Sequence, residues 1–187
     1  MKKISCLIYL ITLINCAGPA AITTEPKYPS KPIEKIVAKQ IVELETRKYK
    51  YDTIKQKFIF IKPTNPVASI ILFEGGRDPL DLAEKAGRPY ASNMKHGFCV
   101  RNMDLISQHG FIIALVDAPS DMPGGMTHVY RLSDRHRGDF DPIISFLKEK
   151  ADIPVWVMSM GGATMSAVNM AINPKDEPEG GIPNESE

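Results

Sequence analysis

The chain has 187 residues, a length that suits one domain and allows a substantial hydrophobic core. Hydrophobic residues make up 43% of it and charged residues 24%, which are ordinary proportions for a globular protein. The formal net charge of +1 gives no electrostatic reason to expect nucleic acid or a strongly acidic partner.

The N-terminus has the pattern of an export signal. A short basic start, Met1 to Lys3, precedes an apolar stretch over residues 4–14. This stretch is shorter than the roughly 20 residues of a membrane-spanning helix, and it fits the apolar part of a secretory signal. Residues 1–16 are therefore predicted to be a signal peptide, and the product is expected to be exported to the bacterial cell envelope.

The end of this segment carries a second signal. Leu13, Ile14, Asn15 and Cys16 resemble the lipobox of bacterial lipoproteins, in which the cysteine is acylated and becomes the new N-terminus. The resemblance makes Cys16 the predicted lipidation site and implies anchoring to a membrane. Asn15 departs from the pattern, which has Gly, Ala or Ser there. Ordinary cleavage near residues 17–21, giving a periplasmic protein, and an uncleaved anchor remain as alternatives.

Composition separates the rest of the chain into three parts. Residues 17–32 are rich in Pro, Ala and Thr and are predicted to be a flexible tether. Residues 173–187 hold five acidic residues, three prolines and two glycines, so they are predicted to be disordered. The domain is thus expected over residues 33–172. Its single cysteine, Cys99, excludes an internal disulfide there and is predicted to be a buried structural thiol.

The domain alternates between strand and helix patterns. Residues before Pro63 predict two or three strands at the antiparallel edge of a mixed sheet, the clearest over 57–62. Central strands are predicted at 69–76, 111–121 and 153–158. Helices are predicted within 93–110, 136–152 and 161–172, and residues 122–134 are expected to form an irregular loop. This order favours an α/β domain whose strands are mostly parallel, with right-handed crossovers.

Two of these helices have a predicted buried face. In the first, the apolar residues at helical spacing are Phe98, Leu105 and Ile106. In the second, they are Phe140, Ile143, Ile144 and Leu147.

Residues 154–169, PVWVMSMGGATMSAVN, follow the order of a nucleophile elbow, which is a strand, a sharp turn carrying a serine, and a helix. Ser159 is the candidate nucleophile, and Gly161 provides the small residue needed where strand and helix backbones pass closely. Val157 stands two residues before the serine, where the signature has glycine. The motif is therefore half of the usual one.

A candidate oxyanion hole accompanies the serine. In such an elbow one donor is the N–H of the residue after the nucleophile, here Met160, and another comes from a loop after an earlier strand. The sequence EGGR over residues 74–77 ends such a strand, so Gly76 and Arg77 are the candidates. The alternative is a plain Gly-Gly turn.

Residues 53–172 resemble the first half of the α/β-hydrolase fold, and within it a group of exported or uncharacterised bacterial hydrolases. The resemblance is carried by ILFEGG, FCVRNMDLISQHGFIIALVDAPSD, HRGDFDPIISFLKEKADIPVW and SMGGATMSAVNMA. It implies an incomplete α/β-hydrolase-like sheet, mixed but mostly parallel, with flanking helices. It also implies hydrolysis of a small-molecule ester or acyl substrate through a serine, without a cofactor. No His, Cys or Asp set has the spacing of a metal site.

The resemblance leaves two registers open. If residues 154–156 and 164–167 are both aligned without a gap, Ser159 takes the place of the first glycine of the signature. Gly161 then stands where the nucleophile should be, and the nucleophile has been lost.

The acid and base that would activate the serine are missing from their usual place. In this fold both follow the nucleophile, but all four histidines precede Ser159: His96, His109, His128 and His136. His128 follows the carboxyl end of a strand, where sites form, although a solvated loop histidine is the simpler interpretation. His136 is expected to have a surface or capping role.

These observations predict an exported hydrolase-like protein, truncated relative to the fold, with little or no activity. One alternative is a non-catalytic, lipid-anchored envelope protein that uses the half-fold for binding or assembly, and another is an esterase that uses His128. Stopping after the last helix would leave the strand at Ile153 with an unpaired edge, so self-association is a further expectation.

Overall fold

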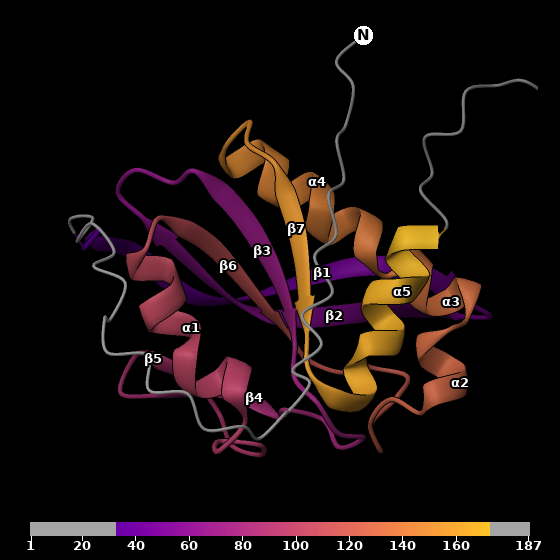
Figure 1. Cartoon of the computed structure of the whole chain (residues 1–187). Coiled ribbons are helices and arrows are strands. Elements are labelled where there is room, and N and C mark those ends of the chain that lie inside the picture. Colours follow the sequence, from indigo (N-terminus) through magenta and orange to yellow (C-terminus); the bar gives the residue numbers. More distant parts are fainter. Residues whose placement is uncertain (1–32, 173–187) are drawn as a thin grey trace, which may run out of the picture.

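A computed structural model describes residues 33–172 of the chain (Figure 1). The predictions for the signal peptide, Cys16, the tether and the acidic tail therefore lie outside the described residues. Among residues 33–172, no helix is long and apolar enough to cross a membrane.

A five-stranded mixed sheet forms the centre of the molecule. Its spatial order is β1-β2-β6-β3-β7. β3, β6 and β7 are parallel, whereas β2 is antiparallel to both of its neighbours. The prediction of a mixed α/β domain with an antiparallel N-terminal edge is confirmed. The strands are β1 (Ile36–Tyr49), β2 (Asp52–Pro63), β3 (Ala68–Phe73), β6 (Phe111–Val116) and β7 (Val155–Ser159).

Helices cover both faces of this sheet, which gives a three-layer arrangement (Figure 1). One face carries α1 (Phe98–Gln108) and the hairpin of β4 (Leu82–Lys85) and β5 (Arg88–Ala91). The other face carries α4 (Phe140–Lys150) and α5 (Thr164–Ile172). The short helices α2 (His128–Arg131) and α3 (Asp134–Gly138) lie beside α5.

The alternation of side chains along the strands divides the core into two halves. The half under α4 contains Phe58, Phe60, Ile112, Ala114, Phe140, Ile143 and Leu147. The half under α1 contains Ile59, Ile61, Ile113, Leu115, Cys99 and Met103. The predicted face of α4 is confirmed, since Phe140, Ile143 and Leu147 are buried and Ile144 packs against them.

The predicted face of α1 is wrong in two of its three residues. Phe98 and Leu105 are 47% and 52% exposed, and the buried residues of this helix are Cys99, Met103 and Ser107. The start of α1 is held against the end of β3, because the Glu74 carboxylate accepts the Val100 N–H at 3.1 Å and Cys99 Sγ contacts the Phe73 carbonyl at 3.7 Å, so Cys99 faces the sheet.

Cys99 agrees with its prediction, because it is a fully buried free thiol. Burial, with a further contribution from the charge of Glu74, raises the pKa of the Cys99 thiol to about 12. The thiol therefore stays protonated and unreactive at neutral pH.

Three further predictions need correction. Residues 122–134 are not wholly irregular, because Thr127 caps α2 by accepting the Tyr130 N–H. The β4–β5 hairpin, over residues 82–91, was not predicted, and the charges of these two short strands hide their pattern. β7 lies at the end of the sheet rather than at its centre.

Candidate functional site

The carboxyl ends of the parallel strands bring the predicted site residues together. Ser159 is the last residue of β7 and is paired with Phe73, the last residue of β3. The Met160 N–H donates to the Phe73 carbonyl at 3.2 Å. A Cβ at Gly75 would lie 3.0 Å from the Met160 carbonyl oxygen, so glycine is needed for this close approach. The loop after β3 and the turn after β7 therefore contact each other through their backbones.

The strand-to-helix turn is centred on Gly161 rather than on Ser159. Ser159 belongs to β7, and Met160 is extended, with φ −122° and ψ 145°. Gly161 has φ +51°, and the chain then enters a 3-10 turn, η1 (Gly161–Ala163), that leads into α5. In a nucleophile elbow the nucleophile itself occupies the strained position of the turn. The backbone geometry therefore agrees with the register that places Gly161 at the nucleophile position.

The surroundings of Ser159 lack activating groups. Within residues 33–172, no hydrogen bond joins its hydroxyl to a histidine or a carboxylate. The candidate oxyanion donor Met160 has its N–H committed to the sheet. Gly76 and Arg77 accept at their carbonyl oxygens from Arg131 Nη2 at 3.0 Å and from the Met126 N–H at 2.8 Å, which fixes the loop without using the N–H groups predicted as oxyanion donors.

His128 lies beside the turn although no motif connects the two in sequence. It is exposed at the first position of α2, and a Cβ at Gly162 would lie 3.2 Å from its Nε2 atom. The fold thus brings one imidazole next to the residue that follows Gly161. Its partner in hydrolysis would have to be a side chain at that turn, where the chain has two glycines.

A buried polar cluster lies behind the turn, and the sequence analysis missed it. The Ser166 hydroxyl oxygen is 2.9 Å from both Arg131 Nη1 and His136 Nε2. Arg131 Nη2 also donates to the Gly76 carbonyl, so the cluster holds the loop after β3. Arg131 is 2% exposed, and His136 and Ser166 are 0% exposed.

The predicted surface or capping role of His136 is wrong. Ser133 caps α3 by accepting the His136 N–H, and this start of the helix turns the imidazole inward. The ring packs against Phe73, Tyr130 and Phe140, with its centroid 4.4 Å from that of Phe140. A serine three residues before the histidine was the available signal, because Ser is a preferred N-cap.

The electrostatics of the cluster keep His136 neutral. Burial, together with the positive charges of Arg131 and Arg47, lowers the pKa of His136 to about 3. Because a guanidinium only donates, Ser166 accepts from Arg131. Ser166 Oγ and His136 Nε2 share a hydrogen bond whose direction depends on the ring tautomer, and His136 Nδ1 has no partner within residues 33–172. This serine–histidine pair is sealed from solvent and is a structural one.

A second network fixes α2 and α3 to the sheet edge. The buried Asp139 carboxylate accepts from Thr46 Oγ1 at 2.7 Å, Arg47 Nε at 3.0 Å and the Tyr130 hydroxyl at 2.7 Å. Asp121 pairs with the same Arg47 at 2.7 Å. The network therefore joins β1 to the segment that carries His128.

The VDAPSD segment, residues 116–121, has a structural role in the described residues. The Asp117 carboxylate, which is 6% exposed, accepts the N–H groups of Leu80, Leu82 and Ala118. These bonds hold the β4 segment against the carboxyl end of β6. Asp117 thus shapes the rim of the candidate site without facing a substrate.

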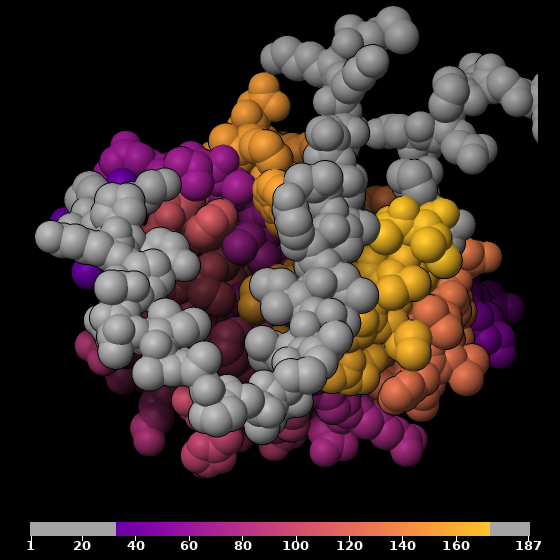
Figure 2. Space-filling view, viewed as in Figure 1, coloured from indigo at the N-terminus to yellow at the C-terminus, as the bar shows by residue number. Residues whose placement is uncertain are grey.

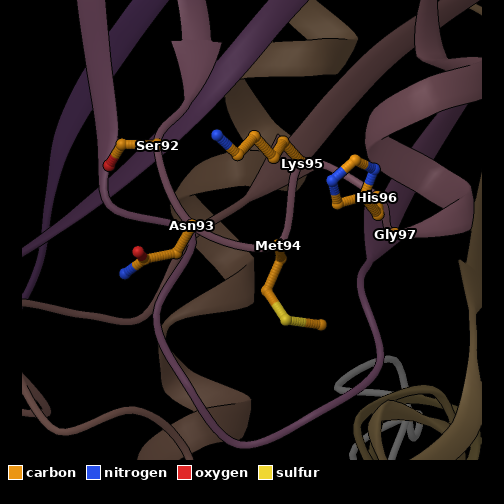
Figure 3. A pocket seen from close by; sticks show the side chains of 6 residues that line it. All are labelled: Ser92, Asn93, Met94, Lys95, His96 and Gly97. Atoms are coloured by element: carbon orange, nitrogen blue, oxygen red, sulfur yellow. The ribbon is translucent and has the colours of Figure 1, made fainter.

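Figure 3 shows an open hollow lined by residues 92–97. Met94 connects it to the site, because a Cβ at Gly76 would lie 3.0 Å from the Met94 Cε atom. The other lining side chains are short or polar, and they include Lys95 and His96. None of the predicted catalytic residues lines this hollow.

The arrangement offers an elbow-like turn without a serine at its strained position. Among residues 33–172, no group of three or more His, Cys, Asp or Glu side chains could hold a metal ion. A scan against protein-family models gives no match, and searches of curated proteins and of solved structures give none either.

Proposed function

We propose that this chain is an α/β-hydrolase-like protein of the bacterial cell envelope that has lost its ester- or acyl-hydrolase chemistry. The observation that carries the proposal is the positive φ of Gly161 at the turn between β7 and α5. In this interpretation Gly161 occupies the nucleophile position, and Ser159 occupies the position of the first glycine of the signature.

The contacts around the turn support this proposal. A strand, a sharp turn and a helix follow one another in the required order, and the glycine loop after β3 touches the turn. The Met160 N–H is bound to Phe73, and Ser159 has no base within hydrogen-bond reach among the described residues. A serine hydroxyl without a base is a weak nucleophile, so chemistry at Ser159 is not expected.

Two comparisons test the loss of activity. The whole chain and its Ser159→Ala variant are assayed with p-nitrophenyl acetate and with a fluorophosphonate probe. We expect both proteins to match buffer in the first assay and to remain unlabelled in the second. A rate or a label that disappears in Ser159→Ala would overturn the proposal.

The register is tested by returning a serine to the turn. Gly161→Ser places a hydroxyl at the strained position, next to the residue that contacts His128. We expect fluorophosphonate labelling of this variant above wild type, and its loss when His128→Ala is added. Absence of labelling in a folded Gly161→Ser protein would count against Gly161 as the nucleophile position.

The envelope location rests on residues outside the described part of the chain. The N-terminal signal pattern and Cys16 support export and lipid anchoring, and an anchored non-catalytic protein would use its α/β domain for binding or assembly. We expect Cys16→Ser to move the protein from the membrane fraction to the soluble fraction. Unchanged partitioning would remove the lipoprotein proposal.

A further inference from the structure

β7 has an open hydrogen-bonding edge within the described sheet. It pairs with β3 alone and ends the order β1-β2-β6-β3-β7. The Pro154 carbonyl accepts the Ser69 N–H, and the Met160 N–H donates to Phe73, so even-numbered residues direct their backbone groups toward β3. Because these groups alternate along a strand, those of Val155, Val157 and Ser159 point to the open side.

The two edges of the sheet differ in how they discourage pairing. β1 carries Lys39, Glu43, Glu45 and Lys48 and has two register shifts against β2. Charges and bulges of this kind protect an edge from other strands. β7 has neither, and residues 153–172 include no Asp, Glu, Lys or Arg although 24% of the whole chain is charged. The β7 edge thus lacks the protection that the β1 edge has.

α5 continues this unprotected surface. Met165, Val168 and Ile172 follow one another at helical spacing and are 37%, 37% and 67% exposed. The buried side of the same helix carries the polar residues Ser166 and Asn169. Met170 packs against the core, so the helix carries apolar side chains on both its inward and its exposed side, unlike an ordinary surface helix. In Figure 2 the α5 atoms lie at the surface of the molecule.

We propose that β7 and α5 form the interface of a homodimer. In it, β7 pairs antiparallel with β7 of a second copy about a twofold axis near Val157, and α5 packs against its own copy. The two five-stranded sheets then become one continuous sheet. Such an isologous contact uses the same patch on both partners.

The chemistry of the patch fits a second copy. A twofold axis sets the patch against its own copy, so like charges near the axis would repel, and residues 153–172 include no charged residue. The backbone groups of residues 155, 157 and 159 point outward. When β7 pairs antiparallel with its copy about Val157, residue 155 lies opposite residue 159 of the copy, so the N–H and C=O groups of the two strands can bond to each other. A neutral edge would provide no attraction for a strongly charged partner. The interface does not depend on whether the turn at Gly161 is catalytic.

The test is sedimentation equilibrium of the whole chain in density-matched detergent. Val157→Pro removes an outward N–H and leaves the even-numbered bonds to β3 in place. Val168→Lys places a charge next to its own copy across the axis. The control is Val37→Lys, at a residue that is 57% exposed on the opposite edge. We expect a wild-type dimer, at least tenfold weaker association in the first two variants, and an unchanged constant in the control.

Three results would overturn the proposal. The first is a wild-type chain that stays monomeric at every concentration, as it would if another segment of the same chain covered the edge. The second is association that survives both Val157→Pro and Val168→Lys. The third is equal weakening by Val37→Lys. Circular dichroism of each variant shows whether the fold is retained, and Val168→Lys, at a partly exposed helix position, keeps the test valid if Val157→Pro fails to fold.

Discussion

Acidification should destabilise this protein through His136, and the size of the effect follows from its burial. The pKa of His136 falls from an ordinary value of 6.5 to about 3 in the folded chain, because the ring is buried and faces the positive charges of Arg131 and Arg47. Between these values the unfolded chain binds a proton that the folded chain does not. The stabilisation is therefore complete above pH 6.5 and is lost as the pH falls toward 3.

The size of the His136 contribution to the free energy of unfolding follows from the difference between the pH and the pKa of histidine in the unfolded chain. Each unit below 6.5 removes about 1.4 kcal/mol from the free energy of unfolding, so the His136 contribution falls by about that amount at pH 5.5 and by about twice that amount at pH 4.5. Urea unfolding at pH 7.5, 5.5 and 4.5 measures it. Other groups titrate in the same range, so the quantity of interest is the difference between wild type and His136→Gln.

The comparison with His136→Gln isolates the contribution of this residue. We expect His136→Gln to reduce the pH dependence of the free energy of unfolding by the amounts above. Equal pH slopes for wild type and His136→Gln would refute the reasoning. If that variant does not fold, the ring proton resonances of His136 are followed by NMR against pH in the folded wild-type protein. A titration midpoint near pH 6.5 would contradict a neutral buried imidazole.

Two further substitutions test the turn and the core. Gly161→Ala should lower the free energy of unfolding by about 1–2 kcal/mol because of the positive φ at Gly161. The control Gly124→Ala, in open space with an ordinary φ, should lower it by less than about 0.5 kcal/mol, and equal losses in thermal unfolding would contradict the turn geometry. Leu147→Ala should lower the free energy of unfolding by about 2–5 kcal/mol because Leu147 is fully buried. Leu105→Ala should lower it far less because Leu105 is half-exposed, and similar urea midpoints for the two variants would show that the α1 and α4 faces are assigned incorrectly.

The sequence predicts most of the sheet because its buried strands are apolar throughout. Apart from Ser69, the stretches at β3 and β6 are apolar on both faces, which is typical of a strand covered by helices on both sides. The face of α4 is equally clear, since Phe140, Ile143 and Leu147 repeat at helical spacing. The pattern fails for α1 because the long apolar side chains Phe98 and Leu105 are exposed and the small residues Cys99 and Ser107 are buried.

Predicting the site depends on features that residue patterns do not encode. Whether Ser159 or Gly161 stands at the turn is a difference of two residues, and it is decided by where β7 ends against Phe73. The close approach of His128 to Gly162 depends on the position of α2. Tyr130 of α2 bonds to Asp139, and Asp139 bonds to Arg47 of β1, which is 92 positions away in the sequence. Such long-range hydrogen bonds leave no local period in the sequence. A serine and a histidine at a strand-to-helix motif are therefore insufficient evidence of catalysis, because here the bonded pair is Ser166 with His136, and both side chains are closed to any substrate.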